Sequence, residues 1–542
     1  MKLASTRLSV VVLLLLLAAQ TITAMKTKSA TCDEFAHHLA NGYSYLLTHD
    51  FRMNPASPPL SRMLPAAPLL FFDAKLPLNH PSWATIDSPE FAKQFFYHAN
   101  HGVADKFIFW SRVPIVLVSV LFGLVLFTWS RSLFGDAGGL AALVLYVFSP
   151  NILAHSGLAT ADLMVAFFFF SSLVSFWAYL RNPRPKNLFL TGFLVGLTFL
   201  SKFSAVLLLP ILLLIALFSK KTEAIRPKKT LLFLATCFIT VWAGYFFEVK
   251  PLLQHTPDPA KKEAFIQKIG GEGLVTFAKT VPIPLATFSS AVVSMAFTRA
   301  NGCDAFLLGQ WSTNGWWYYY FVAFFLKETI PFIILMAGSF FFLRSLRLDR
   351  VTMAVLLVPV VFFFIVTLRD KAQAGIRYFL PIFPCLFVLA GGFAAHLWQK
   401  RSKALKVLVV ALLSWHVVES LSIYPDYLAY FNEFAGGPSN GYKYLRDSNI
   451  DWAQDLKGVG VLTQKEKYPE VVVISMGIQS PSDYNIPYRW PEAEEFKKPR
   501  DTVYAVGAHR IDSVTWAAGL KPTAVVGHSF FIYDMRTKGP DK

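Results

Sequence analysis

Charged residues are scarce in this chain: Asp, Glu, Lys and Arg together make up 16% of its 542 residues. Soluble domains carry about 25% charged residues, whereas this chain is 54% hydrophobic with a mean hydropathy of +0.45. Its four cysteines are too few for a disulfide scaffold and form no Cys-x-x-Cys pair. Gly-x-Gly-x-x-Gly and His-Glu-x-x-His patterns are also missing, so soluble nucleotide chemistry and zinc proteolysis lose support.

The sequence contains long apolar runs. Each is near the ~20 residues that cross about 30 Å of hydrocarbon. The runs predict about eleven transmembrane helices, at residues 8–24, 113–130, 137–150, 161–180, 188–201, 204–219, 230–247, 317–343, 352–368, 378–397 and 406–422. The first run has an alternative interpretation as a secretory signal peptide, although Ile22 stands where a small residue is preferred before cleavage.

Basic residues dominate the charge, with a formal net charge of +17. Such a balance can indicate a nucleic-acid partner, but these residues lie in short clusters between apolar runs. That is the positive-inside pattern of a multi-pass membrane protein. When the spans alternate in direction, four clusters fall on one side, at residues 181–186, 220–229, 344–350 and 400–406. The pattern predicts a cytoplasmic N-terminus, an extracytoplasmic C-terminus and no nucleic-acid partner.

Three large segments then face the outer side: the loops 25–112 and 248–316, and the tail 423–542. The tail contains a stretch with helical character, 442–459. Short apolar runs typical of strands follow it, at residues 471–476, 502–506, 523–526 and 530–533. We therefore expect a polytopic α-helical membrane domain over residues 1–422 and a small extracytoplasmic α/β domain after it.

An acidic pair, Asp33 and Glu34, lies about ten residues after the first apolar run, and His37 follows one helical turn later. Acids beside hydrocarbon are costly and usually functional. Asp33 and Glu34 are candidate catalytic residues, because a carboxylate can take a proton from an attacking hydroxyl. Glu34 and His37 are also candidate metal ligands. Arg52 precedes a proline-rich corner, 55–59, that could direct it toward the acids as a substrate-binding residue; contact with lipid headgroups is the alternative.

Four further candidates lie at predicted outer turns. His155 and Asp162 are seven residues apart, so two helical turns would place them on one face, as substrate-binding and catalytic residues respectively. The alternative for Asp162 is a carboxylate that caps a helix N-terminus. Lys202 and Arg377 are cations at the outer ends of spans, where they could bind a phosphate or reach to lipid headgroups.

Acids, histidines and outward cations together suit the transfer of a group from a lipid-linked phosphate. Cations or a divalent metal ion can stabilise a departing phosphate. Polyprenyl phosphate fits as the leaving group, because nucleotide donors are scarce outside the cytoplasm.

Three stretches of the sequence, 33–37, 50–60 and 153–163, carry a resemblance to a known family. Asp-Glu-x-x-His, Asp-Phe-Arg-x-Asn-Pro with its later Pro-Pro-Leu, and Leu-Ala-His before Ala-Thr-x-Asp-Leu are similar to motifs of protein O-mannosyltransferases and lipid A aminoarabinose transferases. These are C-type glycosyltransferases that use polyprenyl-phosphate sugars. The tail motif 445–456 resembles a bacterial family-39-like subgroup and implies no mechanism of its own.

The resemblance implies the C-type glycosyltransferase fold, a bacterial cytoplasmic membrane, retention of the first helix and an inverting transfer. It implies that Asp33, supported by Glu34, is the catalytic acid, and that Asp162 is the second acidic position. The two cations named above become phosphate contacts. Residues 56–57 are Ala-Ser where relatives often carry Glu-His or Glu-Lys, so no metal or phosphate contact is expected there.

The leading functional prediction is therefore a glycosyltransferase that moves a monosaccharide from a polyprenyl phosphate to an extracytoplasmic protein, lipid or glycan. A transporter or flippase of lipid-linked sugars would need charges deep in spans or broken helices in matching halves, which the sequence does not indicate. A non-catalytic envelope assembly protein is the third alternative. Cys32 and Cys303, both in outer loops, are either a disulfide or two unrelated thiols.

Overall fold

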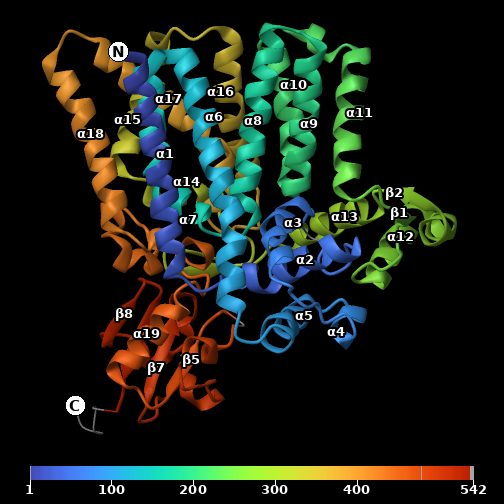
Figure 1. The fold of residues 1–542 in the computed structure, drawn as a ribbon, viewed down its shortest axis with the longest axis vertical. Helices are drawn as coiled ribbons and strands as arrows, with labels where there is room; N and C mark the ends of the chain where they lie inside the picture. The colour runs from blue at the N-terminus through green and yellow to red at the C-terminus, as the bar shows by residue number, and fades with distance from the viewer. Residues whose placement is uncertain (1, 56, 478, 537–542) are drawn as a thin grey trace.

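The computed structural model describes residues 2–55, 57–477 and 479–536. It shows a bundle of long helices with a small sheet-containing domain at one end (Figure 1). The N-terminus lies at the opposite end of the bundle from this domain. The molecule is a multi-pass membrane protein, as its apolar runs predict.

All the predicted spans coincide with helical structure. The helices are α1 (Lys2–Lys26), α6 (Ala104–Val147), α8 (Ala161–Arg181), α9 (Pro185–Ser201), α10 (Leu208–Phe218), α11 (Pro227–Gly244), α14 (Tyr319–Lys327), α15 (Ile330–Phe341), α16 (Arg350–Thr367), α17 (Phe383–Gln399) and α18 (Lys403–Ser422). By length and composition, six helices of the described chain could cross a membrane, or seven if the bent pair α14 and α15 is one span. The shorter α9 and α10 are not among them.

Helix α6 contains two of the predicted spans and turns back on itself at Gly135. This residue has a φ of 72°, a conformation that glycine adopts without the cost a side chain would bring. Across the turn, the Ser119 and Tyr146 hydroxyls lie 3.0 Å apart, and the Ser130 hydroxyl donates to the Gly138 carbonyl at 3.2 Å. The two halves of α6 therefore pack as an antiparallel hairpin.

The span predicted at 317–343 is not one continuous helix, because α14 and α15 meet at an angle of 120°. Pro331 in the first turn of α15 explains the break: it has no N–H to donate to the carbonyl four residues earlier. That carbonyl, on Lys327, accepts a hydrogen bond from the Asn151 side chain at 2.7 Å instead. Lys327 and Glu328 are both buried at the break.

The four basic clusters gather at the end of the bundle that carries the N-terminus (Figure 1). Arg181 pairs with Asp349 at 3.0 Å, which joins the first and third clusters. Arg347 and Lys400 line one polar pocket, which joins the third and fourth. This shared end is what the alternation of spans requires. The assignment of that end to the cytoplasm stays a prediction.

The two loops at the other end fold into short elements. The first contains the π-helical turn η1 (Glu34–His38), α2 (Leu39–Thr48), α3 (Leu60–Ala66), α4 (Pro81–Ala84) and α5 (Ser88–Lys93). The second contains β1 (Val249–Pro251), α12 (Pro259–Thr280), β2 (Pro282–Pro284), α13 (Ala286–Asn301), β3 (Ala305–Leu307) and β4 (Gln310–Ser312). The proline-rich corner is non-helical up to the start of α3; residue 56 within it lies outside the described residues.

The tail forms a mixed five-stranded sheet in the order β6-β5-β7-β9-β8, preceded by α19 (Leu456–Glu466). Its strands are β5 (Val471–Ile474), β6 (Tyr488–Arg489), β7 (Val503–Gly507), β8 (Ala524–Val526) and β9 (Phe530–Asp534). The expected helix over 442–459 is wrong. Asp447 has a φ of 57°, and the Asp451 carboxylate accepts from the Ala453 backbone N–H at 3.0 Å, so local side-chain bonds replace helix bonds.

Candidate active site

Four of the residues singled out from the sequence meet in one cluster beneath the helix bundle. Asp33 precedes η1, Asp162 lies in the first turn of α8, Lys202 follows α9, and Arg377 lies in the 3₁₀ helix η7 (Ile376–Ile382) before α17. The Lys202 ammonium donates to Asp162 at 2.6 Å. The Arg377 guanidinium lies 3.3 Å from the Asp33 carboxylate and 3.7 Å from the Asp162 carboxylate.

The two acids of this cluster differ in how deeply their side chains are buried. The Asp162 side chain is 3% exposed, whereas the Asp33 side chain is 30% exposed. A buried carboxylate needs compensation, and Asp162 receives it from Lys202 and Arg377. The N-cap alternative for Asp162 is wrong, because Thr160 is the residue at that position. Asp162 thus holds the two cations in place, and Asp33 is the accessible acid.

Glu34, although adjacent to Asp33, points into the protein and is fully buried. Its carboxylate accepts two hydrogen bonds from Arg112, at 2.8 and 2.7 Å, and one each from the backbone N–H groups of Thr31, at 2.8 Å, and Ala159, at 2.7 Å. Burial favours a higher pKa for Glu34, but Arg112 and these donors hold that pKa below its usual value. Glu34 therefore joins the loop of Asp33 to the segment just before Asp162.

The residues present do not fit the expected metal site at Glu34 and His37. The donors that surround Glu34 leave its carboxylate no open position for an ion. Burial lowers the pKa of His37, and its Nδ1 has no hydrogen-bond partner in the part of the chain that the structure describes. Across the described residues, no group of three or more His, Cys, Asp or Glu side chains could hold a metal ion.

His155 and Arg52 lie outside the cluster's direct contacts. His155, in α7 (Pro150–Ser156), is buried, and its ring packs 6.5 Å from the ring of Trp452. Arg52 donates to Asp50 at 2.7 Å and lies 3.1 Å from His255. The expectation that the proline-rich corner would turn Arg52 toward the acids is wrong, because Asp50 and the second loop hold its guanidinium.

Two aromatic residues that the sequence did not single out complete the cluster. The Arg377 guanidinium lies 4.2 Å from the ring centre of Trp452, and the Lys202 ammonium lies 4.2 Å from that of Tyr378. Both distances suit cation–π attraction. The Cys32 N–H donates to the Trp452 carbonyl at 3.0 Å, so the tail motif forms a wall of the site. The sequence singled out this motif only through its resemblance to a family-39-like subgroup, which implied no mechanism for it.

The proposed pair of Cys32 and Cys303 is not a disulfide, because both cysteines are free. Burial, with a contribution from the neighbouring Asp33, raises the pKa of the Cys32 thiol. The thiol is therefore protonated at neutral pH and unsuited to nucleophilic chemistry.

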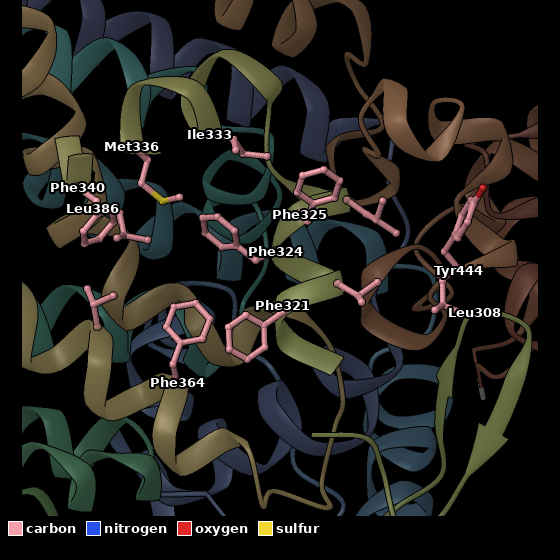
Figure 2. Close-up of a pocket in the computed structure, with 13 residues that line it drawn as sticks. Leu308, Phe321, Phe324, Phe325, Ile333, Met336, Phe340, Phe364, Leu386 and Tyr444 are labelled. Carbon is pink, nitrogen blue, oxygen red and sulfur yellow. The ribbon is translucent and has the colours of Figure 1, made fainter. Parts of the chain in front are cut away.

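An apolar pocket of about 580 Å³ lies between α14, α15, α16 and α17 (Figure 2). Phenylalanine is the most frequent residue in its lining, to which Met336 and Leu386 also contribute. A chain of ring contacts connects it to the site: Phe321 to Phe364 at 4.8 Å, and Phe364 to Phe379 at 4.9 Å. Phe379 is two residues after Arg377 in η7, so these ring contacts link the pocket lining to the element that carries Arg377.

Comparisons with known proteins bear on the fold of the chain. Residues 94–245 match the profile of the dolichyl-phosphate-mannose-protein mannosyltransferase family. No curated protein sequence matches the chain. The solved structure of ArnT from Cupriavidus metallidurans bound to undecaprenyl phosphate is similar, with a TM-score of 0.50 at 10% identity over 96% of this chain and 97% of ArnT. The oligosaccharyltransferase AglB from Archaeoglobus fulgidus, in complex with an inhibitory peptide and a dolichol-phosphate, has a TM-score of 0.43 at 14% identity, over 89% of this chain and 60% of AglB.

The likeness to ArnT shows the fold. The chain is a multi-pass membrane protein with the fold of the C-type glycosyltransferases, as its motifs predict.

Proposed function

We propose that the protein transfers a monosaccharide from a polyprenyl-phosphate sugar to an acceptor on the outer face of a bacterial cytoplasmic membrane. One observation carries the proposal: the accessible Asp33 carboxylate contacts Arg377, and the buried Asp162 holds both Arg377 and Lys202 in place. The undecaprenyl phosphate bound to ArnT, which shares the fold, supports this class of donor. The site then combines a proton acceptor, Asp33, with two phosphate-binding groups, Arg377 and Lys202.

The donor phosphate binds Arg377 and Lys202. The contact between Asp33 and Arg377, at 3.3 Å, is longer than the 2.7–2.9 Å of a strong charge-assisted hydrogen bond. A phosphate oxygen can therefore replace Asp33 at the guanidinium. The displaced carboxylate becomes free to act as a base, so donor binding prepares the catalytic base. The apolar pocket beside η7 suits the first isoprenoid units of the donor.

In the transfer step, an acceptor hydroxyl oxygen attacks the anomeric carbon on the face opposite the phosphate. Asp33 takes the hydroxyl proton as the new carbon–oxygen bond forms. The bond from the anomeric carbon to the phosphate oxygen breaks, and its electron pair leaves with the phosphate. Arg377 and Lys202 stabilise the resulting charge. This single displacement inverts the anomeric configuration.

One observation favours a transporter as the second candidate. The break between α14 and α15 places Lys327 and Glu328 in the interior, a feature of transporters that the sequence did not indicate. The Lys327 ammonium, however, donates to the Leu428 and Asn449 carbonyls at 2.8 and 2.6 Å, which fixes the break to the tail. In the described chain only this one helix pair is bent in this way, whereas an inverted repeat calls for two.

Release of lipid phosphate separates the candidates. The purified protein in detergent is incubated with lipids extracted from its source membranes, and free undecaprenyl phosphate is measured by mass spectrometry. We expect release that depends on Asp33 and disappears in Asp33→Asn. Movement of lipid-linked sugar between the leaflets of a vesicle without release would identify a transporter. The absence of both activities would leave an assembly protein.

A further inference from the structure

We propose that a second, basic pocket binds the phosphate headgroup of an anionic membrane lipid. The pocket has a volume of about 310 Å³ and lies where α1 ends, where α6 begins and where α19 of the tail packs beside them. Its polar lining is Lys26, Lys28, Asp105, Lys106, Arg112 and Lys457. The proposal goes beyond the sugar transfer and does not depend on it.

The charges of this pocket are not balanced. Three of its five cations are neutralised by acids, in the pairs Lys28 with Asp426 and Asp455, Arg112 with Glu34, and Lys457 with Asp105. Lys26 and Lys106 contact only aromatic rings, Phe109 at 5.9 Å and Phe72 at 4.5 Å, and neither has an acidic partner among the described residues. Two ammonium groups are thus available to one anion.

The surroundings of the pocket indicate that this anion is attached to a lipid. Phe71 is 87% exposed, and Leu70 and Trp110 are also exposed. Phe72, which contacts Lys106, packs 5.9 Å from the ring of Trp110. Large exposed aromatic side chains beside lysines are typical of the boundary between membrane and water. A phosphate with acyl chains satisfies both the apolar surface and the two ammonium groups, whereas a free anion satisfies only the latter.

The pocket also touches the candidate active site through one ion pair. Arg112 lines the pocket, and its guanidinium donates to Glu34, the neighbour of Asp33. The Arg112 guanidinium further donates to the Ser29 carbonyl at 2.7 Å, which fixes the start of the loop that carries the acids. A bound headgroup therefore lies against the support of the catalytic loop.

Native mass spectrometry of the full chain in detergent tests the proposal, with phosphatidylglycerol and phosphatidylcholine as probes. We expect tighter binding of phosphatidylglycerol. The double variant Lys26→Ala/Lys106→Ala should bind it about 30-fold more weakly, because each lysine near an anionic surface contributes about one factor of five. The matched control is Lys497→Ala/Lys498→Ala, which removes the same charge from exposed residues of the tail and should leave the affinity unchanged.

Three results would overturn the proposal. Equal binding of the two lipids would mean that the headgroup charge is not recognised. An equal loss of affinity in both double variants would mean that only the net charge of the protein matters, and not this pocket. Displacement of phosphatidylglycerol by inorganic phosphate at similar concentration would identify a site for free phosphate. The unfolding temperatures of all variants should match that of the native protein, because Lys26 and Lys106 are exposed and form no ion pair with any acid that the structure describes.

Discussion

Replacing each of the two adjacent acids by its amide should have different effects. Glu34→Gln should lower the stability of the protein, whereas Asp33→Asn should lower its turnover. Glu34→Gln leaves the Arg112 guanidinium, which is 1% exposed, without its counter-charge. Breaking a buried ion pair by removing one partner costs about 3–5 kcal/mol of unfolding free energy. The glutamine amide would also meet N–H donors where the carboxylate offers only acceptors, so the substitution places the variant at the upper part of that range.

Asp33→Asn is the matched control. The Asp33 side chain is 30% exposed and makes a single ion-pair contact of 3.3 Å, and such partly exposed pairs contribute at most about 1 kcal/mol. We expect nearly native stability with turnover lowered at least ~100-fold, the lower limit for loss of a general base. Denaturant titration of the purified variants, followed by tryptophan fluorescence, gives the free energies. Equal stability of the two variants would refute the structural role of Glu34.

The pH dependence of stability provides a second readout of the same pair. Because the pKa of Glu34 is lowered in the folded state, its contribution is fully present above the ordinary glutamate pKa of about 4.3. The contribution is lost as the pH falls through the lower, folded-state pKa. The native protein should therefore lose stability more steeply on acidification than Glu34→Gln. Parallel acid profiles would show that Glu34 is not ionised in the folded protein.

Three further expectations follow from the same geometry. Lys202→Ala and Arg377→Ala should each weaken binding of undecaprenyl phosphate roughly 10- to 150-fold, the effect of losing one charge-assisted contact. Unchanged affinity in both variants would mean that these residues contact lipid headgroups instead. Trp452→Leu should raise KM about 5- to 30-fold, because the cation–π contact with Arg377 is lost, whereas Trp452→Phe should keep KM close to the native value. An equal rise of KM in both variants would show that the cation–π contact does not contribute. A reporter fused after Arg184 or Lys229 should be cytoplasmic and one fused to the C-terminal end should be outside; the reverse result would invert the topology.

Most of the helical architecture could be predicted, because hydrocarbon thickness fixes the length of an apolar run and each run coincides with helical structure. The hairpin of α6 was also visible as two spans separated by residues 131–136. The break near Lys327 was not predicted, although Pro331 was its signal. An apolar run indicates that a segment lies in an apolar environment, but it does not indicate whether the helix is straight.

The distinction between Asp33 and Glu34 could not be predicted from the sequence. The residues are adjacent, share a charge, and follow the same apolar run. Successive residues of a helical turn point about 100° apart, so the direction of the turn decides which acid faces Arg377 and which faces Arg112. That direction depends on the Ala159 N–H and the Arg112 side chain, which come from segments far along the chain.

The tail motif shows why the functional unit does not end with the last span. Asn449 accepts from the Ile376 N–H at 3.0 Å, and the Ser448 hydroxyl donates to the Ala374 carbonyl at 2.6 Å, so the motif holds the backbone on the N-terminal side of Arg377. Trp452 then covers the guanidinium itself. A boundary at residue 422, drawn where hydrophobicity ends, separates Arg377, the proposed phosphate-binding residue, from the residues that fix its position. Hydropathy locates the membrane spans, but the candidate active site of this chain is completed by a polar segment of the tail that folds back against it.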